Sequence, residues 1–142
     1  MLTYTRDELQ EHFLTLIGKP LGEPGTLSIQ EYSAELIVAT TTFDASHLRP
    51  GGIVSGPSIF TIVDQMGYLV TMSRAPKGSN GFTSAVAMQF LRPALVGTLR
   101  VEGRLLRFSK RSSVVDTILF GDSLEEPVAQ AVVTYVPQFP TG

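Results

Sequence analysis

The 142-residue sequence lacks cysteine, which excludes disulfides, thiolate metal sites and a cysteine nucleophile. Histidine is also scarce, with two residues, so we expect no metal site. Charged residues make up only 17% of the chain, below the roughly 25% of an average soluble domain. The 11 basic and 13 acidic residues leave a net charge of −2, without the basic surplus that nucleic-acid binding requires. Such a weakly charged surface favours burial against a partner subunit.

Long apolar runs are missing as well. No stretch approaches the roughly 18–20 apolar residues of a membrane span. The first eight residues lack the basic segment and apolar run of a signal peptide. A chain of this length fits one domain. We therefore expect a single domain over residues 1–142, a cytoplasmic location, and neither nucleic acid nor membrane as a partner.

The first third of the chain predicts a helix followed by two strands. Thr5 and Glu8 have the spacing of a capping box, and the apolar residues after them recur at helical intervals up to Pro20, which cannot continue a helix. Apolar and polar residues then alternate from Leu27 to Ile29, and residues 31–40 predict a second strand.

A long helix is predicted over residues 57–74, after a loop rich in glycine and proline. Apolar residues cover nearly its whole circumference, which is typical of a buried helix. One narrow stripe is polar: it contains Thr61, Asp64, Tyr68 and Thr71. A charged and unpaired carboxylate in such a place costs several kcal/mol. Three readings of Asp64 therefore stay open: it is held by neighbouring hydroxyls such as Thr61 or Tyr68, it is exposed at an edge of the helix, or it is a base or nucleophile in a dry pocket.

The second half of the chain predicts strands only. Four strands are expected, over residues 82–91, 98–108, 112–120 and 127–136. The connections between the last strands are too short for parallel crossovers. The element order therefore predicts an α+β domain in which an antiparallel sheet curls around the buried helix.

The start of the buried helix, Ser55-Gly56-Pro57, is the second candidate for chemistry. Free amides at a helix N-terminus and the helix dipole favour a developing negative charge. Pro57 has no amide, so Gly56 is the candidate oxyanion donor; the alternative is an ordinary glycine turn. Ser55 lacks the strand-turn-helix elbow of a serine hydrolase. Gly51-Gly52 does not form a nucleotide-binding pattern.

Residues 47–57 together with Asp64 resemble the signature of hotdog-fold acyl-CoA thioesterases, in particular the phenylacetate-pathway and hydroxybenzoyl-CoA branch. The acidic residue follows the first glycine of the helix start by eight positions, as Asp64 follows Gly56. Residues 89–94 resemble the family's Phe-x-Arg-Pro strand, and residues 107–111 resemble its basic turn. Two positions depart from the signature: Arg49 replaces an asparagine and Ser55 replaces a histidine.

The resemblance implies a hotdog fold, hydrolysis of an acyl-CoA thioester, and a homodimer or homotetramer with the active site at the subunit interface. Asp64 is implied as general base or nucleophile and the Gly56 amide as the group that polarises the carbonyl. The implied catalytic positions are Asp64, Gly56, Ser55, His47 and Arg49. The implied contacts to coenzyme A are Arg107, Lys110, Arg111 and Ser84. Coenzyme A is part of the substrate, and no separate cofactor is implied.

Two alternatives remain open from the sequence. One is a hotdog hydratase or dehydratase, although its carboxylate follows the histidine at a shorter spacing than the 17 positions between His47 and Asp64. The other is a non-catalytic acyl-CoA-binding module, which the changes at Arg49 and Ser55 favour. The acyl group is not readable from the sequence. We expect its pocket to draw on Ile59, Phe60, Val63 and residues 82–88.

Overall fold

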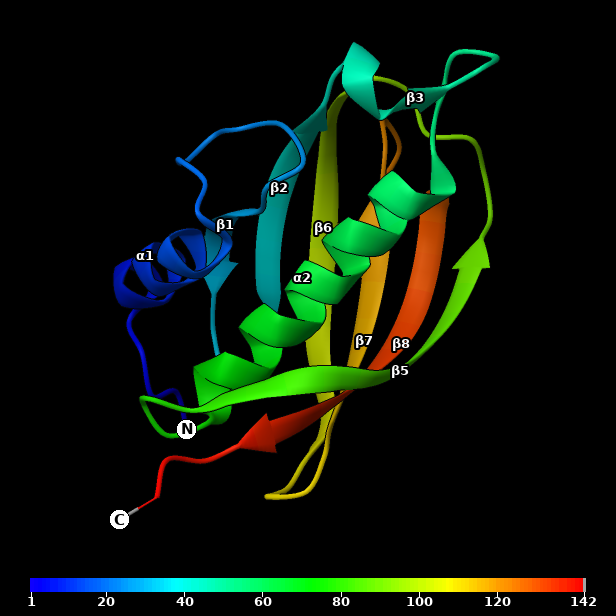
Figure 1. The fold of residues 1–142 in the computed structure, drawn as a ribbon. Helices are drawn as coiled ribbons and strands as arrows, with labels where there is room; N and C mark the ends of the chain where they lie inside the picture. Colours follow the sequence, from blue (N-terminus) through cyan, green and yellow to red (C-terminus); the bar gives the residue numbers. More distant parts are fainter. Residues whose placement is uncertain (142) are drawn as a thin grey trace.

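The computed structural model describes residues 1–141 and shows one curved antiparallel sheet with a long helix across its concave face (Figure 1). The helices and the main strands are α1 (Arg6–Ile17), β1 (Ser28–Tyr32), β2 (Ile37–Phe43), α2 (Gly56–Arg74), β5 (Asn80–Phe90), β6 (Gly97–Phe108), β7 (Ser113–Phe120) and β8 (Pro127–Gln138). A short turn of 3-10 helix (Ala45–His47) and the two-residue strands β3 (Leu48–Arg49) and β4 (Ile53–Val54) precede α2. The sheet order is β1-β2-β6-β7-β8-β5. The predicted α+β architecture is confirmed.

The predicted strand over residues 31–40 is wrong, because a hairpin turn interrupts it. β1 ends at Tyr32 and β2 begins at Ile37. In the turn, the Ser33 amide donates to the Leu36 carbonyl at 3.0 Å, and the Leu36 amide donates to the Ser33 hydroxyl at 3.1 Å. The turn contains no glycine or proline, so the alternating pattern continued across it unmarked. The predicted capping box at Thr5 and Glu8 is confirmed.

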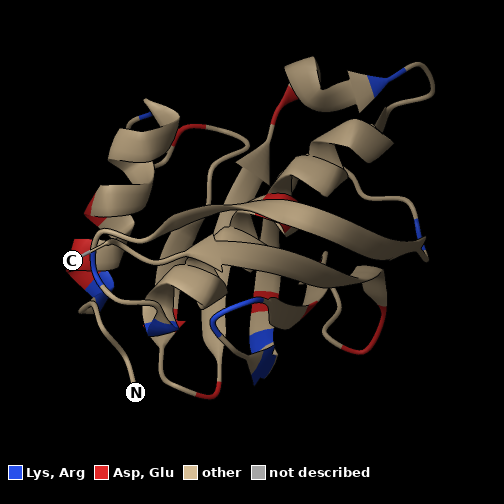
Figure 2. Ribbon diagram, turned by 60° about the horizontal axis from the view of Figure 1, so that its bottom comes forward, with Lys and Arg blue, Asp and Glu red and all other residues tan. Residues whose placement is uncertain are grey.

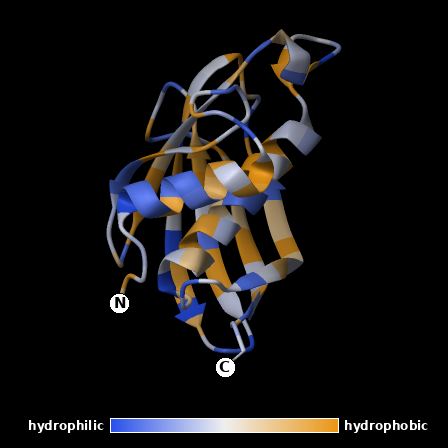
Figure 3. Cartoon of the chain, turned by 60° about the vertical axis from the view of Figure 1, so that its left-hand side comes forward, coloured by the Kyte–Doolittle hydropathy of each residue, from blue (hydrophilic) through white to orange (hydrophobic). Residues whose placement is uncertain are grey.

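The central helix α2 lies unusually close to the sheet. A Cβ atom on Gly67 would lie 2.6 Å from Cγ1 of Val133, and one on Gly103 would lie 2.6 Å from the Met66 side chain. Glycine on both surfaces therefore permits this close approach. Ile62 and Leu69 are fully buried between the helix and the strands. This packing fixes α2 and the positions of every side chain that it carries. Figure 3 shows hydrophobic residues concentrated in α2 and the strands, and hydrophilic residues over most of α1.

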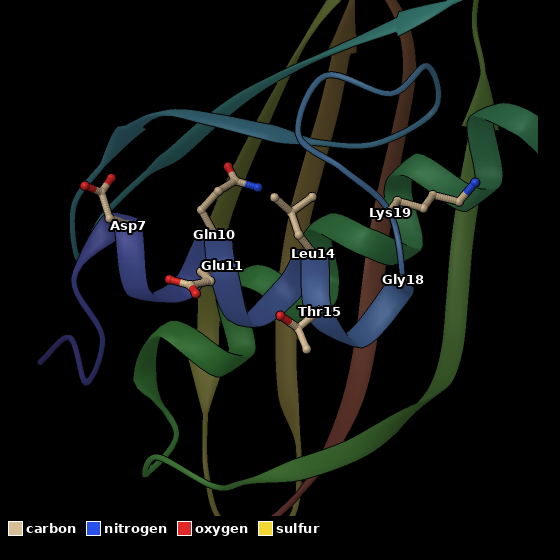
Figure 4. A pocket seen from close by; sticks show the side chains of 7 residues that line it. All are labelled: Asp7, Gln10, Glu11, Leu14, Thr15, Gly18 and Lys19. Atoms are coloured by element: carbon tan, nitrogen blue, oxygen red, sulfur yellow. The ribbon is translucent and has the colours of Figure 1, made fainter.

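The two edges of the sheet differ. Along β1, the Gln10 side chain of α1 donates to the Leu27 carbonyl at 3.1 Å and accepts from the Ile29 amide at 2.7 Å. These are the bonds that a neighbouring strand would make. Figure 4 shows Gln10 on the side of α1 that faces the following chain segment. Along β5, the described residues provide no strand on the outer side, and Phe82 and Phe90 are 52% and 57% exposed.

Candidate active site

The start of α2 offers one free backbone donor. Ser55 is the N-cap, and its hydroxyl accepts from the Ser58 amide at 3.3 Å. Gly56 is the first helical residue, so its amide has no acceptor within the helix. Pro57 follows and has no amide to offer. The Gly56 amide is thus free at the point where the sequence predicted a donor, and its role as an oxyanion donor stays a prediction.

A pocket of about 370 Å³ opens beside Gly56. The Phe90 ring of β5 stands 3.6 Å from the point where a Gly56 Cβ atom would lie. Arg49 also lines the pocket, with its guanidinium bonded to the Pro50 carbonyl at 2.9 Å. The other lining residues are mostly apolar: Ile53, Val54, Ile59, Leu91, Arg92, Pro93 and Ala94. A helix dipole, a free amide and a cation at one apolar mouth can stabilise a negatively charged oxygen.

Asp64 lies near the middle of α2 and is half-buried. Its Oδ1 atom accepts a hydrogen bond of 2.5 Å from the hydroxyl of Thr83 on β5. The Thr61 hydroxyl is occupied elsewhere, since it donates to the Pro57 carbonyl at 3.0 Å. The hydroxyl that holds Asp64 is therefore neither Thr61 nor Tyr68, and sequence reasoning missed Thr83. Its signal in the sequence was a threonine that, with Ser84, interrupts an apolar stretch from Phe82 to Met88.

The polar stripe predicted on α2 is not continuous in the structure. Thr61 is exposed, whereas Tyr68 and Thr71 are buried. The Thr71 hydroxyl bonds that of Ser113 on β7 at 2.9 Å. Thr61 and Tyr68 therefore share a pocket with Asp64, whereas Thr71 faces the sheet.

A second pocket of about 370 Å³ surrounds Asp64. The residues that line it come from α1, α2, β5 and β8: Phe13, Leu16, Ile17, Thr61, Gln65, Tyr68, Gly81, Phe82, Thr83 and Tyr135. Burial raises the pKa of Tyr68 to about 12. Burial, and then the Asp64 charge, raise the pKa of Tyr135 to about 12. Both phenols therefore stay protonated at neutral pH. Of the expected lining, Phe82 and Thr83 are here and Ile59 is in the Gly56 pocket. Val63 is fully buried and Phe60 is 43% exposed, and these two line neither pocket.

Within one chain, Gly56 and Asp64 belong to different pockets. Eight residues separate them on the same helix, which is about 12 Å along the axis at ~1.5 Å per residue. A reacting carbonyl and the group that attacks it lie only about 3–3.5 Å apart. One chain alone therefore cannot bring both groups to the same carbonyl.

His47 lies outside both pockets. Its Nδ1 atom accepts from the Asp44 amide at 3.2 Å, and the ring packs against Phe43 with centroids 5.0 Å apart. On the other side, the ring fills the space next to Gly25. The Ser55 amide donates to the His47 carbonyl at 2.8 Å, so the loop fixes the start of α2 through its backbone. A catalytic role for the His47 ring stays a prediction.

The basic residues Arg107, Lys110 and Arg111 lie at the end of β6 and in the turn to β7 (Figure 2). Within residues 1–141, none of the three makes an ion pair. Figure 1 shows this turn at the opposite end of the sheet from the start of α2. Ser84 sits at a bulge in β5, exposed, with its hydroxyl donating to the Thr134 carbonyl at 3.3 Å.

Other features of the surface lie away from these groups. A shallow depression of about 430 Å³ follows the outer side of α1 and is lined by polar side chains such as Glu11 and Thr15 (Figure 4). Among the described residues, no three His, Asp or Glu side chains are grouped so that they could hold a metal ion. Neither helix in this part of the chain has the length and apolar character needed to cross a bilayer.

Comparison with known proteins gives a family and a fold. The family model of the thioesterase superfamily matches residues 51–127. A candidate esterase of Saccharolobus solfataricus is 32% identical over 94 residues, which are 66% of this chain and 61% of that protein. The aligned part thus spans less than two thirds of the relative.

Solved structures agree with the fold. A candidate thioesterase from Silicibacter sp. TM1040 superimposes with a TM-score of 0.85 at 29% identity, covering 99% of this chain and 95% of that one. A hypothetical thioesterase of Streptococcus pneumoniae TIGR4, solved with coenzyme A, has a TM-score of 0.75 at 22% identity over 92% of this chain and 99% of that one. A phenylacetic acid degradation-related protein of Ralstonia eutropha JMP134 has a TM-score of 0.77 at 20% identity over 94% and 99%. The predicted hotdog fold is confirmed.

Proposed function

This chain belongs to the thioesterase superfamily, and from that membership we propose that it hydrolyses an acyl-CoA thioester to the free acid and coenzyme A. The observation that carries the proposal is the arrangement on α2, where a free amide at Gly56 and a half-buried carboxylate at Asp64 lie in separate pockets. A free amide and a carboxylate together can hydrolyse one thioester. In this proposal one copy of the chain provides the amide, and a second copy provides the carboxylate.

The Gly56 amide polarises the thioester carbonyl in this proposal. The carbonyl oxygen accepts its hydrogen bond at the positive end of the α2 dipole. Negative charge builds on that oxygen when the carbonyl is attacked, so the donor stabilises the transition state more than the substrate. One such donor contributes roughly 3–4 kcal/mol to lowering the barrier.

Asp64 of a second copy supplies the attack. As a general base it takes a proton from water while the water oxygen bonds to the carbonyl carbon. The carbon–sulfur bond then breaks, and the coenzyme A thiolate leaves and takes up the proton. As a nucleophile, the Asp64 carboxylate bonds to the carbonyl carbon and displaces the coenzyme A thiolate. Water then cleaves the resulting anhydride, which releases the acid and restores the carboxylate. On either route, the Thr83 hydroxyl holds Oδ1 and so orients the carboxylate.

The unpaired edge at β5 supports assembly as a homodimer or homotetramer. Its exposed backbone can pair with the same strand of a second copy, since most homo-oligomers form by two-fold symmetric contacts. The exposed Phe82 and Phe90 then lose contact with water. A two-fold axis at β5 reverses the direction of the second α2, so the start of one helix lies toward the middle of the other.

Coenzyme A recognition is proposed at Arg107, Lys110 and Arg111, with Ser84 nearer the thioester. Arginine and lysine bind phosphate strongly, and arginine does so through two parallel hydrogen bonds. The same two-fold arrangement carries the basic turn of the second copy toward the Gly56 end of the first. The Streptococcus pneumoniae protein solved with coenzyme A supports this ligand. A cytoplasmic location is part of the same proposal, because the proposed substrates are coenzyme A thioesters.

Acyl-CoA binding without turnover is the second candidate function. It is favoured by Arg49, whose guanidinium lines the Gly56 pocket where the family signature has an asparagine. Purified protein incubated with a panel of acyl-CoA thioesters separates the two, with free thiol measured for hydrolysis and calorimetry for binding. Thiol release above the spontaneous rate supports the enzyme. Binding with no thiol release supports the non-catalytic module. If the protein neither releases thiol nor binds any of the thioesters, both candidate functions are overturned.

A further inference from the structure

Arg49 brings an unpaired positive charge to the pocket at the start of α2. The pocket is lined by two arginines, Arg49 and Arg92, and within residues 1–141 by no aspartate or glutamate. Arg92 has partners, since its Nε atom lies 3.8 Å from the Glu126 carboxylate and its Nη1 atom donates to the Pro127 carbonyl at 2.9 Å. Arg49 makes no ion pair in the described chain, and only its Nη1 atom is bonded, to the Pro50 carbonyl. Most of its N–H donors therefore remain for an anionic group of a ligand.

The β3–β4 hairpin holds this guanidinium in place. Arg49 on β3 pairs with Ile53 on β4, and the Gly52 amide donates to the Arg49 carbonyl at 3.2 Å. Gly51 in the turn has φ +106°, and a Cβ atom on it would contact Nη1 of Arg49 at 3.7 Å. Because the bond to the Pro50 carbonyl already limits the motion of the side chain, less of its freedom is lost when an anion binds. The planar fork suits a carboxylate, to which it donates two parallel hydrogen bonds.

The anion at Arg49 is either a carboxylate of the acyl group or a phosphate of coenzyme A, and the size of the pocket favours the carboxylate. A round pocket of about 370 Å³ is about 9 Å across. Gly56 and Arg49 both line it, so a group bonded to Arg49 lies within about that distance of a carbonyl bonded to the Gly56 amide. The nearest phosphate of coenzyme A follows the thioester sulfur by roughly 13 bonds, which span more than ~15 Å when extended. A carboxylate on the acyl group reaches Arg49 without the ligand folding back on itself.

The same dimension sets the length of the acyl group. A guanidinium nitrogen and a carboxylate oxygen lie about 2.8 Å apart in such a bond, which leaves about 6 Å between the thioester carbon and the carboxylate carbon. At ~1.5 Å per carbon–carbon bond, this distance is roughly four bonds. The methylene groups of the chain then contact the apolar wall, which includes Ile53, Val54 and Ile59.

We propose that Arg49 is a specificity-determining residue that selects acyl groups ending in a carboxylate roughly four to five bonds beyond the thioester carbon, as in the thioesters of short dicarboxylic acids. This inference rests on the proposed thioester hydrolysis and adds to it the class of acyl group. Arg49 is also a position at which the chain departs from the family signature, where a neutral asparagine stands. The charge that this selection needs is therefore a property of this chain.

The test compares acyl groups of one shape that differ in charge. Glutaryl-CoA and adipoyl-CoA are each paired with the thioester that has a terminal amide in place of the carboxylate, and free thiol is measured above the spontaneous rate. In the native protein, we expect kcat/KM to favour the carboxylate in at least one pair by about fivefold or more, the upper range for an ion pair in contact with solvent. In Arg49→Gln, which keeps a polar side chain and removes the charge, that ratio should fall to about one.

Arg104→Gln is the matched control and should leave the ratio unchanged. Arg104 is also an exposed arginine without an ion pair in the described chain, but it lies on β6 and lines a different pocket. A native ratio near one for both pairs, or a ratio that falls equally in Arg104→Gln, overturns the inference.

The inference is also overturned if Arg49→Gln loses the same factor on carboxylate and amide, because Arg49 then acts on the carbonyl or on coenzyme A, which both substrates share. If none of the four thioesters is hydrolysed, the proposed function fails instead. The uncleaved thioesters then serve as ligands, and the same ratios are read from their dissociation constants with the same criteria.

Discussion

The two edges of the sheet differ in whether another part of the chain covers their backbone hydrogen-bonding groups. At β1, a side chain from α1 provides the hydrogen bonds of a missing strand: Gln10 bonds the Leu27 carbonyl and the Ile29 amide. At β5, the edge has no such cover in the described chain, and its side chains include the exposed Phe82 and Phe90. Thr83, which holds Asp64, lies on the same open strand. The closed edge thus serves stability, while the open edge is the side at which, in the proposal above, two copies complete the site.

Blocking the open edge should have the largest effect. Ala85 and Ala87 are exposed on β5, and lysine on an edge strand disfavours pairing with another strand. The double variant Ala85→Lys/Ala87→Lys should be monomeric by light scattering, near 15.4 kDa. Its kcat/KM should fall by more than about 1000-fold, because the base of one copy and the oxyanion donor of the other then no longer meet at one carbonyl.

Lysine on the closed edge is the matched control for that change. Gln30 is exposed on β1, and Gln30→Lys should leave both the assembly and the activity as they are. A monomeric β5 variant that still hydrolyses thioesters at the native rate would contradict a site shared by two copies.

Removing the carboxylate next to the open edge should have the second largest effect. Asp64→Asn keeps the shape of the side chain and its contact with Thr83 but cannot take a proton or attack a carbonyl. We expect kcat to fall by about 100-fold or more with the assembly retained. Asp116→Asn is the control, because Asp116 is a half-buried carboxylate bonded to Gln130 at 2.7 Å on β8. Equal losses in the two variants would argue that Asp64 has a structural role.

Removing the hydrogen bond between β5 and Asp64 should lower kcat less than removing the carboxylate does. Thr83→Val removes the hydroxyl and keeps the branched shape, so Asp64 keeps its charge and loses its orientation. A drop in kcat of about tenfold is expected, the scale of one hydrogen bond to a charged group. Thr83→Ser, which retains a hydroxyl, should recover most of the activity. If valine and serine behave alike in steady-state kinetics, the Thr83 bond has no part in positioning the carboxylate.

Opening the closed edge should affect stability and barely affect rate. Gln10→Leu leaves the Leu27 carbonyl and the Ile29 amide without their partner. We expect the free energy of unfolding to fall by about 1–3 kcal/mol, read from the urea midpoint. The kcat measured well below the unfolding transition should match that of the native protein. A large loss of activity in the folded variant would show that the β1 edge also serves the site.

Most of the fold could be predicted from the sequence, because the patterns that indicate its elements are local. The capping box at Thr5, the buried helix and the strand-only second half all follow from short-range patterns. The turn at Ser33 could not be predicted in this way, because no glycine or proline marks it. Its chain reversal is held by a hydrogen bond to a serine side chain instead. Predictions based on periodicity alone extend a strand through such a turn.

The site was only partly visible in the sequence for a related reason. Gly56 and Asp64 lie on one helix, so their spacing could be read directly. Thr83 and Tyr135 reach Asp64 from β5 and β8, and their approach depends on how those strands pair. Gln10 likewise looked like any polar residue on a surface helix, and only the fold shows that it closes β1. Contacts between distant segments leave no short pattern.

Mixing two inactive variants tests the shared site most directly. Gly56→Pro removes the proposed donor, and Ser55, with φ −66° and ψ 148°, already has the backbone that a following proline requires. Asp64→Asn removes the carboxylate, and Gly56→Ala, which keeps the amide, is the control for the glycine change. When the two inactive variants are unfolded and refolded together, half of the dimers are mixed and each mixed dimer has one complete site. Activity should return to about one quarter of the native value, as expected for a two-fold symmetric pair with sites at the interface. A mixed sample that forms dimers and stays as inactive as its two components would contradict the account.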